Sequence, residues 1–112
     1  MSDPGTDPEA IARAYYGAID EGWYDDLREL LGADFLHDRP DRDIEGPDEF
    51  VRFMREERPL TETAHELDDC YRNGGSVAVQ GRLRHDGETL FAFVDVHAIE
   101  DGRIAHLRTY TG

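Results

Sequence analysis

The chain has 112 residues, of which 38% are hydrophobic and 34% are charged, which is enough for one folded domain and too little for two. Twelve basic against 26 acidic residues give a formal charge of −14, so phosphate backbones and anionic membranes are repelled, and we expect neither nucleic acid nor a membrane as partner. A single cysteine, Cys70, excludes an internal disulfide and a cysteine metal site.

The basic residues are all arginine, with no lysine. Molar salt shortens the Debye length to ~3 Å and removes most of the self-repulsion of an acidic chain, so this composition predicts a salt-rich cytoplasm and a halophilic source. Codon bias in a genome of high GC content is the alternative explanation. The chain starts without a basic and then apolar signal peptide, and no apolar run approaches the ~18 residues of a membrane span, so we expect a cytoplasmic protein.

Three helices are predicted in the first half of the chain. The first begins at Asp7-Pro8, a capping residue followed by proline in the first turn, and ends at Gly22. Its apolar stripe recurs at three and four residues and consists of Ile11, Ala14, Tyr15, Ala18 and Ile19. The second helix ends at Gly32, and its predicted buried side consists of Trp23, Leu27, Leu30 and Leu31.

An extended segment at 35–37 and a polar turn at 39–43 are predicted to lead into the third helix. Pro47 opens that helix and Pro59 closes it. Its apolar positions are Phe50, Val51, Phe53 and Met54.

Four strands are predicted in the second half, at 64–71, 76–84, 89–99 and 103–111. The segments between them supply the glycine or asparagine that tight hairpin turns require, so the strands should form an antiparallel meander. Helices followed by strands predict an α+β fold, one domain over residues 1–112, with the helices on one face of a curved sheet.

The strand at 89–99 carries the main site candidates because both of its faces are largely apolar. Asp95 and His97 share one face with Phe91 and Phe93. A buried carboxylate needs a charge partner, hydrogen-bond donors, or a raised pKa that keeps it neutral. Asp95 is therefore either a functional group in a pocket or a structural partner of an arginine such as Arg39 or Arg108.

Other candidates carry weaker signals. Tyr15 either only packs in the core or extends its hydroxyl into the pocket. His37 and Asp38 either lie in a solvated loop or form a catalytic dyad. His65 is expected to face inward as a satisfied core histidine. No cluster has the spacing of a metal site, and no metal or other cofactor is expected. The side chains expected to contact a ligand are Trp23, Phe53, Phe91, Phe93 and Arg39.

The chain resembles the SnoaL-like branch of the nuclear-transport-factor-2-like superfamily over almost its whole length. The resemblance is carried, in this order, by residues 15–22 (YYGAIDEG) with Asp25, 44–50 (IEGPDEF), 93–97 (FVDVH) and 101–104 (DGRI). It implies a conical α+β barrel, with the curved antiparallel sheet wrapped around the N-terminal helices and a pocket between them, commonly in a homodimer.

Ketosteroid isomerase, polyketide cyclases, dehydratases, epoxide hydrolases and binding modules share this fold. Set against ketosteroid isomerase, Tyr15 matches the oxyanion tyrosine and Asp95 the protonated oxyanion aspartate. The general-base position falls on Arg39, with Asp38 one residue early, so this chain departs from the steroid isomerase pattern. His97 or His37 is then the candidate base.

Two functions follow from this reasoning. The first is cofactor-free acid–base chemistry on an apolar carbonyl compound, as in an isomerase, cyclase or dehydratase, with Asp95 as acid, His97 as base and Tyr15 as oxyanion donor. The second is a binding or assembly module without turnover. In both cases we expect a homodimer through the outer face of the sheet, where Ala92, Val94, Val96 and Ala98 form an apolar strip.

Overall fold

The computed structural model describes residues 7–57 and 63–111. The helices are α1 (Pro8–Glu21), α2 (Tyr24–Leu30), α3 (Pro47–Arg52) and the π-helical turn η1 (Phe53–Glu57). The strands are β1 (Leu31–Asp38), β2 (Asp43–Glu45), β3 (Ala64–Asn73), β4 (Ser76–His85), β5 (Glu88–Glu100) and β6 (Arg103–Thr111). The predicted helical first half and stranded second half are confirmed, with β1 and β2 inserted between α2 and α3.

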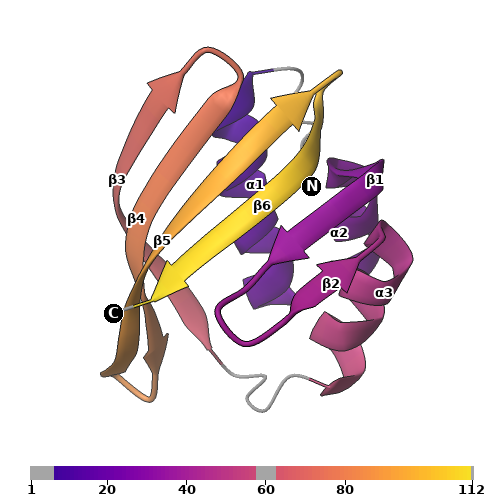
Figure 1. The fold of residues 1–112 in the computed structure, drawn as a ribbon. Helices are drawn as coiled ribbons and strands as arrows, with labels where there is room; N and C mark the ends of the chain where they lie inside the picture. The colour runs from indigo at the N-terminus through magenta and orange to yellow at the C-terminus, as the bar shows by residue number, and fades with distance from the viewer. Residues whose placement is uncertain (1–6, 58–62, 112) are drawn as a thin grey trace.

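One curved, unclosed sheet contains all six strands in the order β2-β1-β6-β5-β4-β3. Figure 1 shows α1 lying behind this sheet, with α2 and α3 beside β1 and β2. The strands from β3 to β6 pair antiparallel with their chain neighbours, as the meander prediction requires. The α+β prediction, with the sheet curved around the N-terminal helices, is thus confirmed.

Strands β1 and β2 complete the sheet in a way that the meander prediction does not include. β1 lies beside the last strand, β6, and pairs with it in parallel, while β2 pairs antiparallel with β1. The turn predicted at 39–43 therefore joins two strands, and Ile44 is buried. β2 has only three residues, too few to show the alternation that predicts a strand from sequence.

The boundaries of α1 follow the predicted capping residues, whereas α2 ends at Leu30 and the predicted end at Gly32 lies within β1, because Leu31 already pairs with β6. Asp7 accepts a hydrogen bond from the backbone of Ala10, and Gly22 ends α1 in the left-handed conformation with φ of 74°. Trp23 is an exception to the prediction, because its side chain is 43% exposed. It occupies the cap position before α2, where the chain turns between two helices, and so it faces away from the core. Pro59, the predicted end of the third helix, lies outside the described residues.

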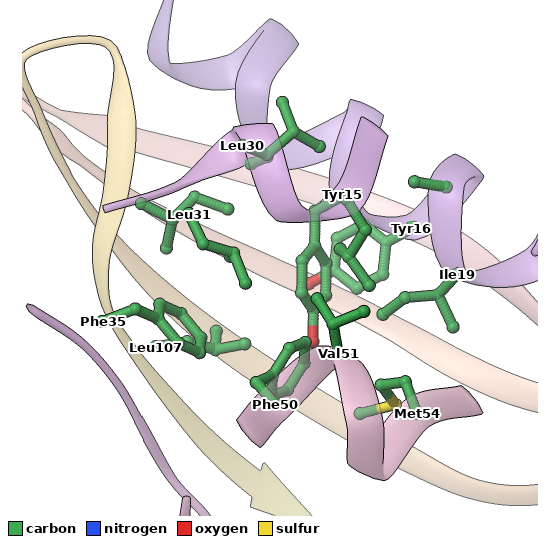
Figure 2. Close-up of a cluster of buried hydrophobic side chains, with 14 of the residues drawn as sticks. Tyr15, Tyr16, Ile19, Leu30, Leu31, Phe35, Phe50, Val51, Met54 and Leu107 are labelled. Carbon is green, nitrogen blue, oxygen red and sulfur yellow. The ribbon is translucent and has the colours of Figure 1, made fainter. Parts of the chain in front are cut away.

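The core fills the space between the helices and the concave face of the sheet. Figure 2 shows Tyr15 and Tyr16 of α1 in this core with Phe50, Val51 and Met54 from α3 and η1. The two tyrosine rings meet edge to face at 4.9 Å between centroids. Both rings are almost fully buried, which places the helix hydroxyls inside the molecule.

No helix in the described part of the chain is long and apolar enough to cross a membrane.

Candidate functional site

A cavity of about 300 Å³ opens between the helices and the sheet. Its wall is mostly apolar, and polar side chains interrupt it at few places. The lining residues are Tyr15, Ile19, His37, Arg39, Pro40, Phe53, Met54, Thr63, His65, Leu83, Leu90, Phe91, Phe93, Asp95, Thr109 and Thr111. Such a concave apolar site with few polar groups is typical of small-molecule pockets.

Asp95 of β5 is a buried carboxyl group in this wall, and two hydroxyl groups hold it. The hydroxyl of Tyr16 donates to Oδ2 at 2.6 Å, and the hydroxyl of Thr109 donates to Oδ1 at 2.6 Å. Burial raises the pKa of Asp95, while the two hydrogen bonds oppose this rise by stabilising the charged form. The direction is the one expected from the sequence, although neither Arg39 nor Arg108 is its partner: Arg39 pairs with Asp41 and Arg108 pairs with Asp38.

Two buried histidines bind the same hydroxyls from the other side. Nε2 of His97 lies 2.9 Å from the Tyr16 oxygen, and Nε2 of His37 lies 2.8 Å from the Thr109 oxygen. Each hydroxyl has one hydrogen, which goes to Asp95, so each must accept a hydrogen bond from an Nε2–H group. If the hydroxyls donated to Nε2 instead, each neutral histidine would carry its hydrogen on Nδ1. That buried N–H group would have no acceptor, because neither Nδ1 atom has a hydrogen-bond partner among the described residues.

The two histidines are neutral. Burial lowers the pKa of His97 to about 3, and burial together with the charge of Arg39 lowers the pKa of His37 to about 3. The arrangement is therefore a continuous chain of hydrogen bonds, His97–Tyr16–Asp95–Thr109–His37, with the one carboxyl group at its centre. We call it the Asp95 network.

A β-bulge sets the partner of Asp95. At the β5–β6 hairpin Glu100 pairs with Arg103, a register that would place Arg108 opposite Asp95. The register shifts between Ala98 and Ile99, and Asp95 then faces Thr109. The extra residue, Ala105 of β6, thus replaces a charge partner with a hydroxyl donor.

A second polar pair, Asp20 and His65, lies at the cavity. Asp20 is in the last turn of α1, and its carboxylate accepts both the backbone N–H of His65 at 2.9 Å and the ring Nδ1–H at 2.6 Å. The His65 ring packs against Tyr16 and Phe93, with centroid separations of 5.0 and 5.7 Å. The sequence analysis treated His65 as a core histidine and did not consider Asp20.

The predicted site residues divide into those at the cavity and those away from it. The residues at the cavity are Asp95, Tyr15, His37, Arg39, Phe53, Phe91 and Phe93. His97 lies behind Tyr16, outside the lining, and Asp38 forms an exposed ion pair with Arg108. Trp23 also lies outside the lining, because it sits in the exposed connection between α1 and α2.

Sequence reasoning missed Tyr16, Thr109 and Asp20, and it assigned His65 to the core without a role at the site. The apolar stripe of the first helix indicated Tyr15, but α1 is buried over a wider arc that includes Tyr16. Tyr16 and Asp20 are four residues apart and so share a helix face, a signal that was present in the sequence. Thr109 carried no such signal, because its position depends on the bulge at Ala105 of β6.

Phe53 of the cavity wall is covered by two guanidinium groups, of which that of Arg39 also lines the cavity. Arg39 and Arg42 lie over the ring of Phe53, with 4.9 and 4.6 Å from Cζ to the ring centroid. Within residues 7–57 and 63–111, no group of three His, Cys, Asp or Glu side chains is arranged to hold a metal ion.

Comparison with known proteins gives a family match and a consistent set of folds. A family model described as a SnoaL-like domain matches residues 12–107. No curated protein has a significant match to the sequence.

Solved structures with the same fold have different assignments. A protein from Kribbella flavida assigned as a ketosteroid isomerase is 20% identical, with a TM-score of 0.83 over 94% of this chain and 77% of that chain. An LEH-like epoxide hydrolase of M. tuberculosis is 19% identical, with a TM-score of 0.82 over 96% and 84%. A SnoaL-like protein from Jannaschia assigned as a polyketide cyclase is 18% identical, with a TM-score of 0.79 over 99% and 89%. At these identities the likeness shows the fold alone.

Proposed function

The chain belongs to the SnoaL-like domain family, and from that premise we propose that it binds a small apolar carbonyl compound and moves a proton on it. An isomerase, a cyclase or a dehydratase would each use such a step. The folds similar to this one include proteins assigned to isomerase and cyclase activities. Because fold alone does not determine activity, the proposal rests on the chemistry of the cavity.

The observation that carries the proposal is the environment of Asp95. Its burial among aromatic side chains favours the neutral acid, so the raised pKa makes it a proton donor nearer to neutral pH than an exposed aspartate. Tyr16 and Thr109 already donate one hydrogen bond to each carboxyl oxygen. The acid proton therefore has no acceptor inside the Asp95 network and is available to a ligand oxygen in the cavity.

The cavity supports this role in two further ways. A ligand that fills the mostly apolar cavity would displace water, and this would strengthen a hydrogen bond from Asp95 to a carbonyl oxygen as negative charge develops there. The two hydroxyls and two histidines fix the carboxyl plane, so little reorganisation is needed during the reaction. Asp95 would protonate or hydrogen-bond the oxygen of an enol or enolate formed when an adjacent carbon loses a proton.

Exchange of carbon-bound hydrogen tests this proposal without knowledge of the natural substrate. The ketone 2-tetralone is incubated with the protein in D₂O, and loss of its α-hydrogens is followed by NMR. We expect exchange above the buffer rate and a loss of ~100-fold or more in Asp95→Asn, the range for removal of a general acid.

Asp38→Asn is the matched control, because it removes one carboxylate from an exposed ion pair outside the cavity. The Asp38→Asn variant should exchange the α-hydrogens of 2-tetralone at the rate of the parent protein. If Asp95→Asn folds and exchanges as fast as this control, proton transfer by Asp95 is refuted. If 2-tetralone binds but the parent protein gives only the buffer rate, the binding-module alternative replaces the catalytic one.

A further inference from the structure

The Asp20–His65 pair has the geometry of an oriented base. Asp20 binds His65 at two points, with Oδ2 accepting from the backbone N–H at 2.9 Å and Oδ1 lying 2.6 Å from ring Nδ1. A carboxylate only accepts hydrogen bonds, so Nδ1 must carry the hydrogen. In the neutral ring the lone pair is then on Nε2. The two contacts together fix both the tautomer and the ring orientation.

The environment of His65 leaves that lone pair unused. The His65 side chain is 16% exposed and lines the cavity, and no described residue makes a hydrogen bond to its Nε2. His37 and His97 differ in this respect, because their Nε2 atoms are bonded to hydroxyls and their Nδ1 atoms are sealed in the interior. His65 is therefore the histidine of the described cavity wall with a tautomer suited to accept a proton from a ligand.

Tyr16 connects this pair to the Asp95 network. The hydroxyl of Tyr16 donates its hydrogen to Asp95, and the ring of Tyr16 packs against the imidazole of His65. A ligand in the cavity thus meets an acid whose pKa burial raises and an imidazole that a carboxylate orients. Such a pairing of two titratable groups in different environments is the usual arrangement for acid–base catalysis.

We propose that His65, oriented by Asp20, is the base that works with Asp95; this inference rests on the proposed function and supplies its missing proton acceptor. Nε2 of His65 removes a hydrogen from the carbon next to the carbonyl group. The C–H electron pair forms the new C=C bond, the C=O π pair moves to oxygen, and that oxygen takes the proton of Asp95. The products of the step are an enol, an Asp95 carboxylate and a His65 imidazolium paired with Asp20. With a β,γ-unsaturated carbonyl compound the enol is a dienol. Nε2 of His65 then returns its proton to the γ-carbon while the enol oxygen returns its proton to Asp95, which completes an isomerisation and restores both groups.

The first test reads the tautomers directly in the parent protein. A long-range ¹H–¹⁵N NMR spectrum distinguishes the protonated from the unprotonated ring nitrogen. We expect Nδ1–H for His65 and Nε2–H for His37 and His97. A spectrum with Nε2–H at His65 would overturn the proposal.

The second test uses a reaction that needs a base and no acid. A base takes the C3 hydrogen of 5-nitro-1,2-benzisoxazole, the C3–H pair forms the nitrile, the N–O bond breaks, and a coloured nitrophenolate is released. We expect elimination faster than with an equal concentration of free imidazole, and a loss of ~100-fold in His65→Gln. The positioning residue variant Asp20→Asn should lose at least ~10-fold while Nε2 stays intact.

The controls separate this inference from the proposed function. His85 ends β4 at the β4–β5 turn, outside the cavity lining, so His85→Gln should catalyse the elimination at the rate of the parent protein. Asp95→Asn should retain elimination although it loses exchange of 2-tetralone. A parent protein no faster than imidazole, or a folded His65→Gln variant that equals His85→Gln, would overturn the assignment of His65 and leave the Asp95 result unaffected.

Discussion

Tyr16 bridges Asp95 and His97, so loss of its hydroxyl affects two buried groups at once. In Tyr16→Phe the carboxyl loses a donor and the Nε2–H of His97 loses its acceptor. We expect the variant to lose ~1–3 kcal/mol of unfolding free energy, the cost of leaving a buried polar group unpaired. The pKa of Asp95 should rise further, because the bond from Tyr16 lowers it. Urea unfolding and a ¹³C carboxyl titration measure the two effects.

Tyr71→Phe is the comparison for this change, because it removes the same atom from an exposed tyrosine of β3. Its unfolding free energy should stay within ~0.5 kcal/mol of the parent value. Equal stabilities for the two variants would contradict the Asp95 network.

The buried histidines predict a loss of stability in acid. His37 and His97 have folded pKa values lowered to about 3, whereas both titrate near ~6.5 when unfolded. Between these pH values unfolding takes up one proton per histidine, so the unfolding free energy falls as pH falls, by ~1.4 kcal/mol per pH unit for each. The raised pKa of Asp95 acts in the opposite sense, because the folded state then binds the extra proton. Because two histidines oppose one carboxyl group, the unfolding free energy should show a net decrease as the pH falls from 6.5 to 4.

Urea unfolding at half-unit pH steps, at constant salt, checks this slope. His97→Gln keeps an N–H group near the Tyr16 oxygen but does not titrate, so its slope should be smaller by about 1.4 kcal/mol per pH unit. Parallel curves for the variant and the parent protein would show that His97 is already charged in the folded state.

At the scale of elements, irregularities in the strands decide what the sequence could not predict. Helix ends and hairpin turns were predicted, because Pro8, Gly22 and the turn glycines act locally. A bulge at Asp68 turns Tyr71 outward, although regular alternation placed it with His65 and Leu67. The bulge at Ala105 of β6 likewise places Thr109 opposite Asp95. Neither extra residue can be distinguished from its neighbours in a single sequence, so the fold was more predictable than the site.

Gly81 lies where β4 passes closest to its neighbours. A Cβ at this position would lie 2.6 Å from the carbonyl oxygen of Glu66 and 3.0 Å from Cζ of Phe93. Because one of these atoms belongs to the backbone of β3, the sheet must shift to admit it. We expect Gly81→Ala to lose ~1–3 kcal/mol in urea unfolding.

Gly17→Ala provides the opposite case. Gly17 is in the middle of α1, and a Cβ there would meet nothing within 4 Å. Alanine favours helix over glycine by ~0.5–1 kcal/mol, so this variant should be more stable than the parent protein. Changes of the same sign in the two variants would contradict the close approach at Gly81.

At the scale of the whole molecule, the outer face of the sheet carries exposed apolar side chains. Val94 and Tyr110 are direct neighbours in the β5–β6 pairing and are 37% and 51% exposed. We predict that a second copy of the chain covers this face. Light scattering at micromolar protein in molar KCl should give a dimer, and Val94→Arg should give a monomer.

Trp23→Arg is matched to Val94→Arg, since it adds the same charge at an exposed apolar residue between α1 and α2. It should remain dimeric. A parent protein that scatters as a monomer would refute the prediction, as would a Val94→Arg variant that stays dimeric.

The charge of −14 predicts that salt stabilises the fold. Surface ion pairs such as Arg82–Asp68 weaken in salt, but each contributes only ~0–1 kcal/mol, and the excess of acidic residues leaves a net repulsion to be screened. The urea midpoint should therefore rise as KCl increases from 0.1 to 1 M. A midpoint that stays constant or falls would remove the halophilic interpretation.

The unclosed sheet has two free edges, and each is built so that another strand cannot easily extend it. The β2 edge has only three residues. The β3 edge carries Glu66, Asp68 and Asp69 and is bent by its bulge, features that oppose strand addition. Growth into β-fibrils by edge pairing is therefore disfavoured at both ends, and folded chains should associate through faces of the sheet and not through its edges.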